Sequence, residues 1–331
     1  REPMIIMIIA LVIIIQIKIF NGDLASILVS LLLFYRALGY LVNLQGAWAG
    51  FVRNSTAIES IDTIIKEFKE NEEPQNSTPI HKIEDIQVKD LEITFGNTPV
   101  LKGLNMNIPP KTSIAFVGES GSGKSTLVKL ILGLYSNYSG NIKYDTYDID
   151  AIPTDEMLKI TTLITNDSYL VKGTIRDHLT VSKYTTEDDM FNALEKVNLK
   201  DFVIKNGGLD YELTAGAGNL SGGQKQRLLA AKAILKDSYI YILDEAVSNI
   251  DDYSKNIVLS AFDSIKEGKI IIIISHDLET ITNSDNIYVL KDKKIIEEGT
   301  HNELLDSPSL YKRLFNDQQE LKSKFSAKEV E

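Results

Sequence analysis

The sequence predicts an α/β domain preceded by two membrane-length apolar helices. Three observations support this fold class: a glycine-rich stretch between an apolar run and a helical pattern at 112–132, two long apolar runs at 4–20 and 24–42, and a polar stretch with prolines at 71–83. The glycine-rich stretch predicts a strand-to-helix turn. The apolar runs are longer and more continuous than ordinary core strands.

The composition limits the classes of function that the chain can have. Its 331 residues are 44% hydrophobic and 24% charged, enough to form one full core with a second region to spare. A net charge of −11 argues against a nucleic acid partner. The chain has no cysteine, and its four histidines, at positions 81, 178, 276 and 301, have no ligand-like spacing. The composition therefore indicates neither a disulfide framework nor a structural metal.

Two apolar runs begin the sequence. In the run 4–20 the polar residues are Gln16 and Lys18, and the run 24–42 has a single charge, Arg36. A helix of about 17 residues spans roughly 25 Å, enough for a bilayer core of about 30 Å with some thinning or snorkelling by Lys18. A signal peptide is the alternative for the first run, but no small-residue cleavage site follows it.

The polar turn at 21–23 makes the two runs a predicted transmembrane hairpin, and beyond Val42 the pattern becomes amphipathic. We therefore expect helices at about 4–20 and 24–70, the second of which extends into the cytoplasm. The chain opens without an initiator Met, and we expect it to be part of something longer. The expected organisation is the C-terminal part of a transmembrane domain at 1–70, a linker at 71–83, a soluble domain at 84–318 and a polar tail at 319–331.

Residues 118–126 match the phosphate-binding loop pattern G-x-x-x-x-G-K-[S/T] without a mismatch. In this pattern glycines let successive backbone N–H groups point at a phosphate, and the following helix adds its positive dipole end. We expect Lys124 to reach the β- and γ-phosphates and Ser125 to ligate Mg²⁺. A chance glycine-rich turn is disfavoured by the predicted strand and helix on either side. The expected nucleotide-binding residues here are Gly118, Glu119, Ser120, Gly121, Ser122, Gly123, Lys124, Ser125 and Thr126.

A hairpin is predicted before this loop, because residues alternate at 88–95 and again at 100–108 around a Gly-Asn turn. Phe95, at the end of the first strand, is a candidate to stack on a purine face. Ordinary strand packing explains this aromatic residue equally well.

Two further predicted strands deliver polar side chains to one sheet edge. The strand beginning at Tyr239 ends in Asp244 and Glu245, and the strand beginning at Lys269 precedes His276. Sheets of this class bind ligands at the carboxyl ends of their strands. Asp244 fits a role on Mg²⁺, Glu245 fits a general base for the attacking water, and His276 fits a donor to the γ-phosphate. Taken alone, the carboxylates would suit a helix cap and the histidine a structural role.

A second anion-binding element stands at the start of a predicted helix at 225–235. It consists of Leu220, Ser221, Gly222, Gly223 and Gln224. Because the domain already has a phosphate-binding loop, a second element implies a nucleotide held by another subunit.

These motifs, in this order and approximate spacing, resemble the nucleotide-binding domain of ABC transporters. The resemblance covers residues 84 to about 316, and its most specific part is the pentapeptide 220–224. By this resemblance the chain is identified as the C-terminal part of an exporter-type half-transporter. The implied fold is a P-loop NTPase of the ABC ATPase type, with a helical subdomain at about 153–236. The segments that carry the resemblance are 118–125, 220–224, 244–245, 248–251, 276 and 299–305.

The resemblance also implies the cofactors ATP and Mg²⁺ and a role for each matching residue. Phe95 would stack on adenine, Lys124 and Ser125 would hold phosphate and Mg²⁺, and Asp244 would hold Mg²⁺. Glu245 would be the general base and His276 the γ-phosphate sensor. Ser221 and Gly223 would close over the ATP of the opposite subunit. The further nucleotide-binding residues that the resemblance implies are Gly222, Gln224 and Asp251.

The sequence departs from the family pattern at Asn166. Exporters usually carry Gln-Asp after the strand that precedes the helical subdomain, and this chain has Asn166 and Asp167. We expect Asn166 to take the glutamine's place at the catalytic site and on Mg²⁺. Its shorter side chain puts coupling to the membrane domain in question more than nucleotide binding. The loop 213–219 also lacks the charged residues that exporters usually place before the pentapeptide.

The sequence thus predicts the ATP-hydrolysing subunit of an ABC exporter, in which closure on ATP switches a membrane cavity between its two faces. The expected partners are membrane lipids and a second half-transporter subunit. A homodimer is favoured over a heterodimer because one chain carries both half-sites. The expected location is the bacterial inner membrane, with the nucleotide-binding domain in the cytoplasm.

Three other functions remain open. The first is an exporter of peptides or hydrophobic small molecules. The second is a soluble ABC ATPase that acts on ribosomes or DNA, against which the apolar hairpin and the acidic charge argue. The third is a regulatory ATP-binding module without turnover, against which the intact Glu245 and His276 argue.

Arg36 is the candidate residue for a substrate cavity. The segment 33–38, followed by a long helix, resembles the last membrane helix of bacterial flippases for lipid-linked oligosaccharides. In a membrane, a guanidinium binds an anionic group such as a lipid-linked pyrophosphate, pairs with a carboxylate, or snorkels to the headgroups. The first alternative predicts an anionic, lipid-linked substrate.

Overall fold

The computed structural model describes residues 2–19, 24–70, 80 and 83–328. The chain forms two compact units, Arg1–Glu72 and Glu73–Glu331. The turn expected at 21–23 lies outside the described residues. So does the linker expected at 71–83, except for Ile80 and for Ile83 at its end, both of which are buried.

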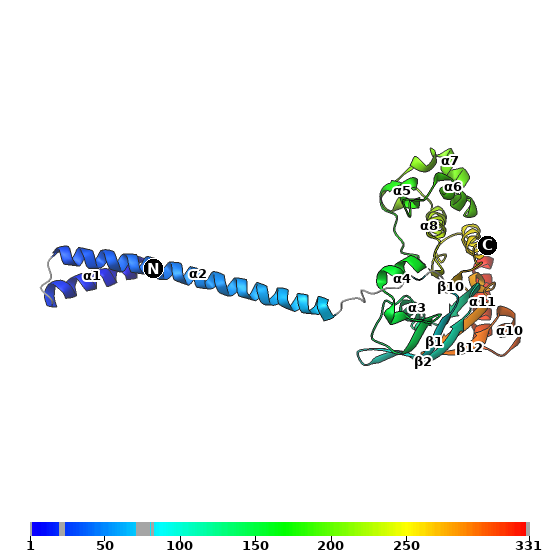
Figure 1. Ribbon diagram of the computed structural model, residues 1–331, viewed down its shortest axis with the longest axis horizontal. Helices are drawn as coiled ribbons and strands as arrows, with labels where there is room; N and C mark the ends of the chain where they lie inside the picture. Colours follow the sequence, from blue (N-terminus) through cyan, green and yellow to red (C-terminus); the bar gives the residue numbers. More distant parts are fainter. Residues whose placement is uncertain (1, 20–23, 71–79, 81–82, 329–331) are drawn as a thin grey trace. The chain divides into compact units, whose positions relative to one another are not determined.

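The first unit consists of two helices (Figure 1), α1 (Glu2–Ile19) and α2 (Leu24–Glu70). α2 has 47 residues. At about 1.5 Å per residue it is roughly 70 Å long, so it exceeds a bilayer core of about 30 Å and must continue into water if it crosses one. Among the described residues, Ala25–Lys69 is the one helix long and apolar enough to cross a membrane, and the apolar helix Ile6–Ile19 is shorter.

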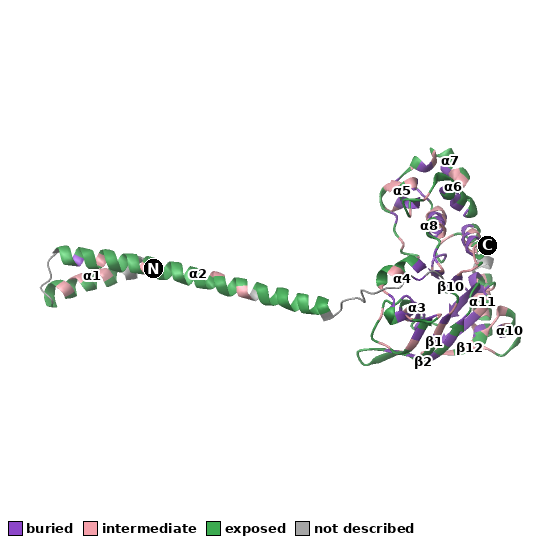
Figure 2. Cartoon of the chain, viewed as in Figure 1, coloured by how far each residue is buried: buried purple, intermediate pink, exposed green. Residues whose placement is uncertain are grey.

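Apolar side chains on these two helices are largely exposed (Figure 2). Leu32 is 65% exposed and Trp48 is 67% exposed. Soluble monomers rarely expose a contiguous apolar patch larger than a few hundred Å². The surface of the first unit is therefore suited to contact lipid or other apolar helices.

The second unit is built on a six-stranded sheet in the order β12-β11-β3-β10-β9-β6. Neighbouring strands are parallel except for β11 and β12. β10 consists of isoleucine alone and is fully buried, as a central parallel strand covered on both faces should be. The strands are β3 (Thr112–Val117), β6 (Thr161–Thr165), β9 (Ile240–Asp244), β10 (Ile270–Ile274), β11 (Asn286–Lys291) and β12 (Lys294–Gly299).

A second, antiparallel sheet has the order β2-β1-β4-β5, and a short pair is formed by β7 and β8. The predicted hairpin is β1 and β2, in which Phe95 pairs with Thr98. The strands are β1 (Ile86–Phe95), β2 (Thr98–Ile108), β4 (Ser139–Tyr144), β5 (Tyr147–Asp148), β7 (Gly173–Thr174) and β8 (Glu212–Leu213). The helices of this unit are α3 (Lys124–Ile131), α4 (Thr154–Ile160), α5 (Ile175–Leu179), α6 (Glu187–Lys196), α7 (Lys200–Lys205), α8 (Gly222–Lys236), α9 (Asp252–Asp263), α10 (His301–Asp306) and α11 (Leu310–Lys328), with short 3₁₀ turns at Ile149–Ala151, Gly208–Asp210, Ala215–Ala217 and Leu278–Ile281.

Side chains of β10 alternate between two cores, one on each face of the six-stranded sheet. Ile271 and Ile273 pack with residues of α6, α8 and α9. Ile270, Ile272 and Ile274 pack with α3 and the antiparallel sheet. This alternation is the two-residue period of a strand. The α/β fold class predicted for the part of the chain that follows the two apolar helices is confirmed.

The structure refines the range 153–236 expected for the helical subdomain. β6 lies inside this range, yet it is the edge strand of the six-stranded sheet, because it pairs with β9 from Thr161 to Thr165. Figure 1 shows α5, α6 and α7 grouped at one end of this unit, with α8 beside them. The helices that stand apart from the sheet therefore begin after β6.

The polar tail expected at 319–331 is helical as far as Lys328, because α11 continues through it. Residues 329–331 lie outside the described part of the chain. The start of α11 is fixed: the carboxylate of Glu297 accepts from the backbone N–H of Leu310 at 2.6 Å and of Tyr311 at 3.1 Å. The tail is thus part of a helix anchored in the domain.

Candidate nucleotide site

The carboxyl ends of parallel strands meet at one edge of the six-stranded sheet. The register aligns Ile274 of β10 with Asp244 of β9, and Asp244 with Thr165 of β6. In such sheets this edge is where ligands bind. The residues that follow β3, β6, β9 and β10 at this edge are the loop 118–123, Asn166, Glu245 and His276.

The loop after β3 requires glycine at both ends. Gly118 has φ +153°, and a Cβ there would lie 2.8 Å from Ser122 Oγ. Gly123 has φ +103° and precedes α3; a Cβ there would lie 3.2 Å from the carbonyl oxygen of Val100. Because the loop packs this closely on β2 and on itself, its backbone can turn its N–H groups toward a bound anion.

Lys124 is the buried cation of this loop, at 6% exposure. Its Nζ donates to the carbonyl oxygens of Gly118 at 2.8 Å and of Glu119 at 3.0 Å. Burial lowers the pKa of Lys124, and the negative charges of Glu245 and Asp244 act in the opposite direction. A bound anion next to Lys124 Nζ would accept charge-assisted hydrogen bonds from this ammonium group.

A cavity of about 270 Å³ connects this lysine to the ends of β9 and β10. Across it, His276 Nε2 lies 2.8 Å from Glu245 Oε1. Both side chains keep exposed surface, so they can reach a bound molecule. The cavity is lined by Val100, Ser120, Gly121, Gly123, Lys124, Ser125, Thr126, Glu245 and His276.

Glu245 has a backbone conformation that is uncommon for a residue with a side chain, with φ +53°. Its N–H donates to the carbonyl oxygen of Ile274 at 2.9 Å, and its own carbonyl oxygen accepts from Ser248 Oγ at 2.9 Å. These bonds hold the sharp turn directly after β9. Backbone strain of this kind is concentrated at functional sites, where the surrounding structure maintains it.

The acids and hydroxyls of this edge suit Mg²⁺ and do not form a closed metal site. Burial raises the pKa of Asp244, and the negative charge of Glu245 raises it further. Within the described residues, no three or more histidine, cysteine or acidic side chains form a cluster that could hold a metal ion. Mg²⁺ is usually held by one or two protein oxygens together with waters and substrate phosphates, so Asp244 and Ser125 fit it.

Asn166 and Phe95 are not among the residues that line this cavity. Asn166 is exposed in the turn after β6, next to Thr165, which pairs with Asp244. Phe95 is 44% exposed and meets the ring of Tyr135 edge-on, with the ring centroids 5.2 Å apart. Its packing leaves surface that a purine could cover.

The serine-glycine element caps α8 of its own chain. Ser221 Oγ accepts from the N–H of Gln224 at 3.2 Å, and Gln224 Oε1 accepts from the N–H of Ser221 at 2.9 Å. Asp251 caps α9 in the same way, since it accepts from the N–H of Ser254 at 2.8 Å, and these hydrogen bonds lower the pKa of Asp251. These residues and the glycines Gly222 and Gly223 do not line the cavity around Lys124.

Sequence reasoning missed the contacts of α11 beside His276. Gln318 Nε2 donates to the carbonyl oxygen of His276 at 2.8 Å, and Lys322 Nζ donates to Asp277 at 2.9 Å. A pattern in the sequence could have indicated these contacts. Residues 311, 314, 315, 318 and 322, which are buried or half-buried, have the i, i+3, i+4, i+7 and i+11 spacing of one helix face. Because the last two residues of this face, Gln318 and Lys322, are polar, the sequence there looks like the solvent-exposed end of a helix.

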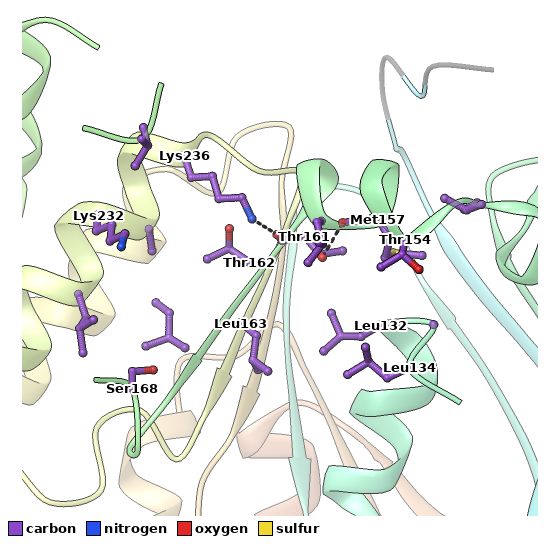
Figure 3. Close-up of a pocket in the computed structure, with 17 residues that line it drawn as sticks. Leu132, Leu134, Thr154, Met157, Thr161, Thr162, Leu163, Ser168, Lys232 and Lys236 are labelled. Atoms are coloured by element: carbon purple, nitrogen blue, oxygen red, sulfur yellow. Dashed lines mark hydrogen bonds between the residues drawn. The ribbon is translucent and has the colours of Figure 1, made fainter. Parts of the chain in front are cut away.

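A second cavity, of about 430 Å³, lies between α3, α4, β6 and α8 (Figure 3). Its lining is mostly apolar and includes Leu132, Met157 and Leu163. On one side Lys236 Nζ donates to the carbonyl oxygen of Thr161 at 2.6 Å, and burial lowers the pKa of this lysine. The cavity therefore adjoins the strand that leads to Asn166.

In a comparison with known protein families, residues 101–248 match the family described as ABC transporter. This range contains the glycine-rich loop, the serine-glycine element and the two acids after β9, and it ends before His276.

Curated relatives and a solved structure extend this similarity. The chain is 40% identical over 238 residues to a Haemophilus influenzae protein described as an uncharacterized ABC transporter ATP-binding protein, covering 71% of this chain and 42% of that protein. It is 32% identical over 248 residues to an ATP-dependent lipid A-core flippase of Francisella tularensis, covering 74% and 41%. It is 34% identical over 239 residues to the ABC multidrug transporter mdr1 of Aspergillus fumigatus, covering 70% and 18%.

Among solved structures, a bacterial Atm1-family ABC exporter with ATP bound superposes with a TM-score of 0.70 at 25% identity. The match covers 78% of this chain and 47% of the exporter. The chain thus spans less than half of the length of each of these proteins.

Proposed function

Residues 101–248 carry the ATPase domain of an ABC transporter, and from this premise we propose that the chain is the ATP-hydrolysing subunit of an ABC exporter. One observation carries the proposal most directly. Lys124 at the start of α3, Glu245 after β9 and His276 after β10 line a single cavity. This places a phosphate-binding cation, a carboxylate and an imidazole around the same small volume.

In the proposed reaction, ATP supplies the phosphoanhydride bond that is hydrolysed. Mg²⁺, when bound, would neutralise negative charge on the phosphate oxygens. Lys124 would bind the β- and γ-phosphates, and Ser125 and Asp244 would hold Mg²⁺. Glu245 would accept a proton from the attacking water as the water oxygen bonds to the γ-phosphorus, and the bond from this phosphorus to the β–γ bridging oxygen breaks, so that ADP leaves. His276 would donate a hydrogen bond to the γ-phosphate. Its contact with Glu245 at 2.8 Å holds the two side chains close to each other, where both can face the γ-phosphate.

A second subunit completes the proposed site. Ser221 and Gly223 lie at the start of α8, outside the lining of the cavity around Lys124, and we propose that this helix start acts on a nucleotide held by a partner. Because one chain carries both half-sites, we favour a homodimer. Phe95 would stack on the adenine, and Asp251 would be among the residues that bind nucleotide.

The first unit supports a membrane location for this subunit. α2 is long and apolar enough to cross a bilayer, and its apolar side chains are exposed. We propose the bacterial inner membrane, with the ATPase domain in the cytoplasm.

The proposed substrate is an anionic, lipid-linked saccharide. Two observations favour it: Arg36 lies in the apolar half of α2, and relatives of the domain include ATP-dependent lipid A-core flippases. A multidrug transporter is also among the relatives, which keeps hydrophobic small molecules as the second candidate.

The apolar cavity beside β6 fits the coupling step of this proposal. Leu158 and Leu163, which line it, are 58% and 41% exposed. We propose that Asn166, directly after β6, takes part in coupling closure of the nucleotide site to the membrane domain. Coupling between distant sites is carried by packed elements that have two discrete arrangements.

Replacement of the general base tests the proposal. Glu245→Gln should lower ATP turnover by roughly 100-fold or more and leave ATP binding in place. Glu267→Gln is the matched control, because Glu267 is an exposed carboxylate that pairs with Lys111 before the start of β10. Unchanged turnover in Glu245→Gln would remove the base assignment.

The two remaining alternatives give different results. A regulatory ATP-binding module would bind ATP without measurable turnover in the unchanged chain. A soluble ABC ATPase would hydrolyse ATP but would stay in the aqueous fraction when membranes are sedimented.

A further inference from the structure

The loop after β10 carries His276 and is held from both sides by one side chain of α11. We call residues 275–278 the His276 loop. Gln318 Nε2 donates to the carbonyl oxygen of His276 at 2.8 Å, and Gln318 Oε1 accepts from the N–H of Leu278 at 2.8 Å. A single amide thus fixes the backbone on either side of Asp277, as a neighbouring strand would.

Asp277, between these two hydrogen bonds, is held by two lysines. Its carboxylate accepts from Lys322 Nζ of α11 at 2.9 Å and from Lys255 Nζ of α9 at 2.7 Å. The Asp277 and Lys255 side chains are only 20% and 12% exposed. An ion pair this far from solvent is screened less than a surface pair. The His276 loop is therefore tied to the helix that Asp251 caps as well as to α11.

The contacts of α11 belong to one face of the helix. Tyr311 is buried in the core and Phe315 packs against it, which fixes the rotation of α11. The same face then presents Gln318 and Lys322, at i+3 and i+7 from Phe315, to the His276 loop. The helix changes from apolar to polar on this face at the point where it reaches the loop. Anchoring at Tyr311 thus determines where the amide of Gln318 lies.

The His276 side chain itself is 53% exposed, so its position depends mainly on the backbone that carries it. β10 ends at Ile274, and Gln318 bonds to the chain two residues later. We propose that Gln318, supported by Lys322, is a positioning residue that holds His276 against Glu245 for hydrolysis. This inference rests on the proposed function. It gives the C-terminal helix a part in the reaction although α11 supplies no residue to the cavity lining.

Gln318→Ala and Gln319→Ala form a matched pair to test it. Gln319 is the next residue on the same helix, and its amide donates to Glu279 at 2.7 Å without contact to the His276 backbone. Gln318→Ala should lower kcat roughly tenfold or more and change KM for ATP by less than about twofold, since misplacement of a catalytic group by about 1 Å reduces rate strongly. Gln319→Ala should keep both constants near those of the unchanged chain.

A double-mutant cycle separates positioning from general stability. If Gln318 acts through His276, then Gln318→Ala should have little further effect on the single-turnover rate in a His276→Ala background. Gln318→Glu keeps the acceptor for Leu278 but loses the donor to His276, so it should give an intermediate kcat. Equal melting temperatures for Gln318→Ala and Gln319→Ala would show that the difference in rate is local.

Each outcome decides one question. Equal kcat for Gln318→Ala and Gln319→Ala, or full additivity of Gln318→Ala with His276→Ala, would overturn the positioning role. If His276→Ala and Glu245→Gln both hydrolyse ATP normally, the proposed function itself fails. If those two variants are inactive while Gln318→Ala is normal, only the inference about α11 fails.

Discussion

Gly223 lies directly against Asp251: a Cβ added to Gly223 would stand 2.7 Å from Asp251 Oδ2 and 2.8 Å from Ser254 Cβ. Real Cβ contacts are essentially never this short. Asp251 is also the residue that caps α9, through the N–H of Ser254 at 2.8 Å. The start of α8 and the start of α9 therefore touch at a point where only a glycine fits.

Gly223→Ala should force these two helix ends apart. Overpacking of this kind costs about 1–3 kcal/mol, so the free energy of unfolding should fall by about that amount in urea titrations. Gly222→Ala is the matched control for stability, because its Cβ would meet its nearest atoms at 3.9 Å and 4.0 Å. Equal stability of the two variants would show that α9 moves aside without cost.

The sequence was sufficient to predict the features that depend on local pattern. The glycine-rich turn between β3 and α3, the β1–β2 hairpin and the buried strands that precede Glu245 and His276 follow from glycine spacing and apolar runs. The contacts of Gly223 with Asp251, and of Gln318 with His276, join residues that are far apart in sequence. They depend on how α8, α9 and α11 pack, which no local pattern encodes.

ATP-driven association is the second prediction. Because Ser221 and Lys124 are proposed to act on one nucleotide from different chains, a Glu245→Gln fragment of residues 80–331 should dimerise with ATP and remain monomeric with ADP. Both hydrophobic cores of the domain lie within this fragment. Sedimentation velocity checks the prediction, and equal sedimentation with both nucleotides would contradict a shared site.

The third prediction concerns Asn166, which is exposed after β6 and next to the pair formed by Thr165 and Asp244. If the shorter amide weakens coupling, Asn166→Gln should raise substrate-stimulated ATP hydrolysis and leave the Kd for ATP nearly unchanged. Both are measured on the same preparation. A loss of ATP binding would instead assign Asn166 a local structural role.

Acid stability gives the fourth prediction. Burial alone would raise the pKa of Asp277, but the hydrogen bonds and charges of Lys255 and Lys322 outweigh it and lower the pKa below 3.8. Since the unfolded chain then takes up this proton first, Asp277 stabilises the fold above about pH 4, and this contribution is lost as pH falls through the folded-state pKa. The unfolding free energies of the unchanged chain and of Asp277→Asn should differ at neutral pH and converge between about pH 5 and pH 2.

The control for this experiment is Asp306→Asn, which removes an exposed carboxylate from the end of α10. Its unfolding free energy should run parallel to that of the unchanged chain over the same pH range. A constant gap between Asp277→Asn and the unchanged chain down to pH 2 would contradict a lowered pKa.

The last prediction concerns Arg36, an exposed cation in the apolar half of α2. If Asp23 marks the outer boundary of the membrane, about 13 residues at about 1.5 Å each place Arg36 roughly 20 Å deep in a core of about 30 Å. A guanidinium that faces lipid at the centre of a bilayer costs on the order of 3 kcal/mol, so a watery cavity or a polar partner is favoured.

A bidentate guanidinium binds a pyrophosphate better than an ammonium does. If the proposed anionic, lipid-linked substrate binds at Arg36, Arg36→Ala should abolish substrate-stimulated ATP hydrolysis and lipid flipping in vesicles, while basal hydrolysis by the ATPase unit continues. Arg36→Lys should recover part of the stimulation. Arg53→Ala is the matched control, because Arg53 lies in the later, polar half of the same helix. Normal flipping by Arg36→Ala would leave Arg36 as an anchor to the headgroups and would remove the charge argument for an anionic substrate.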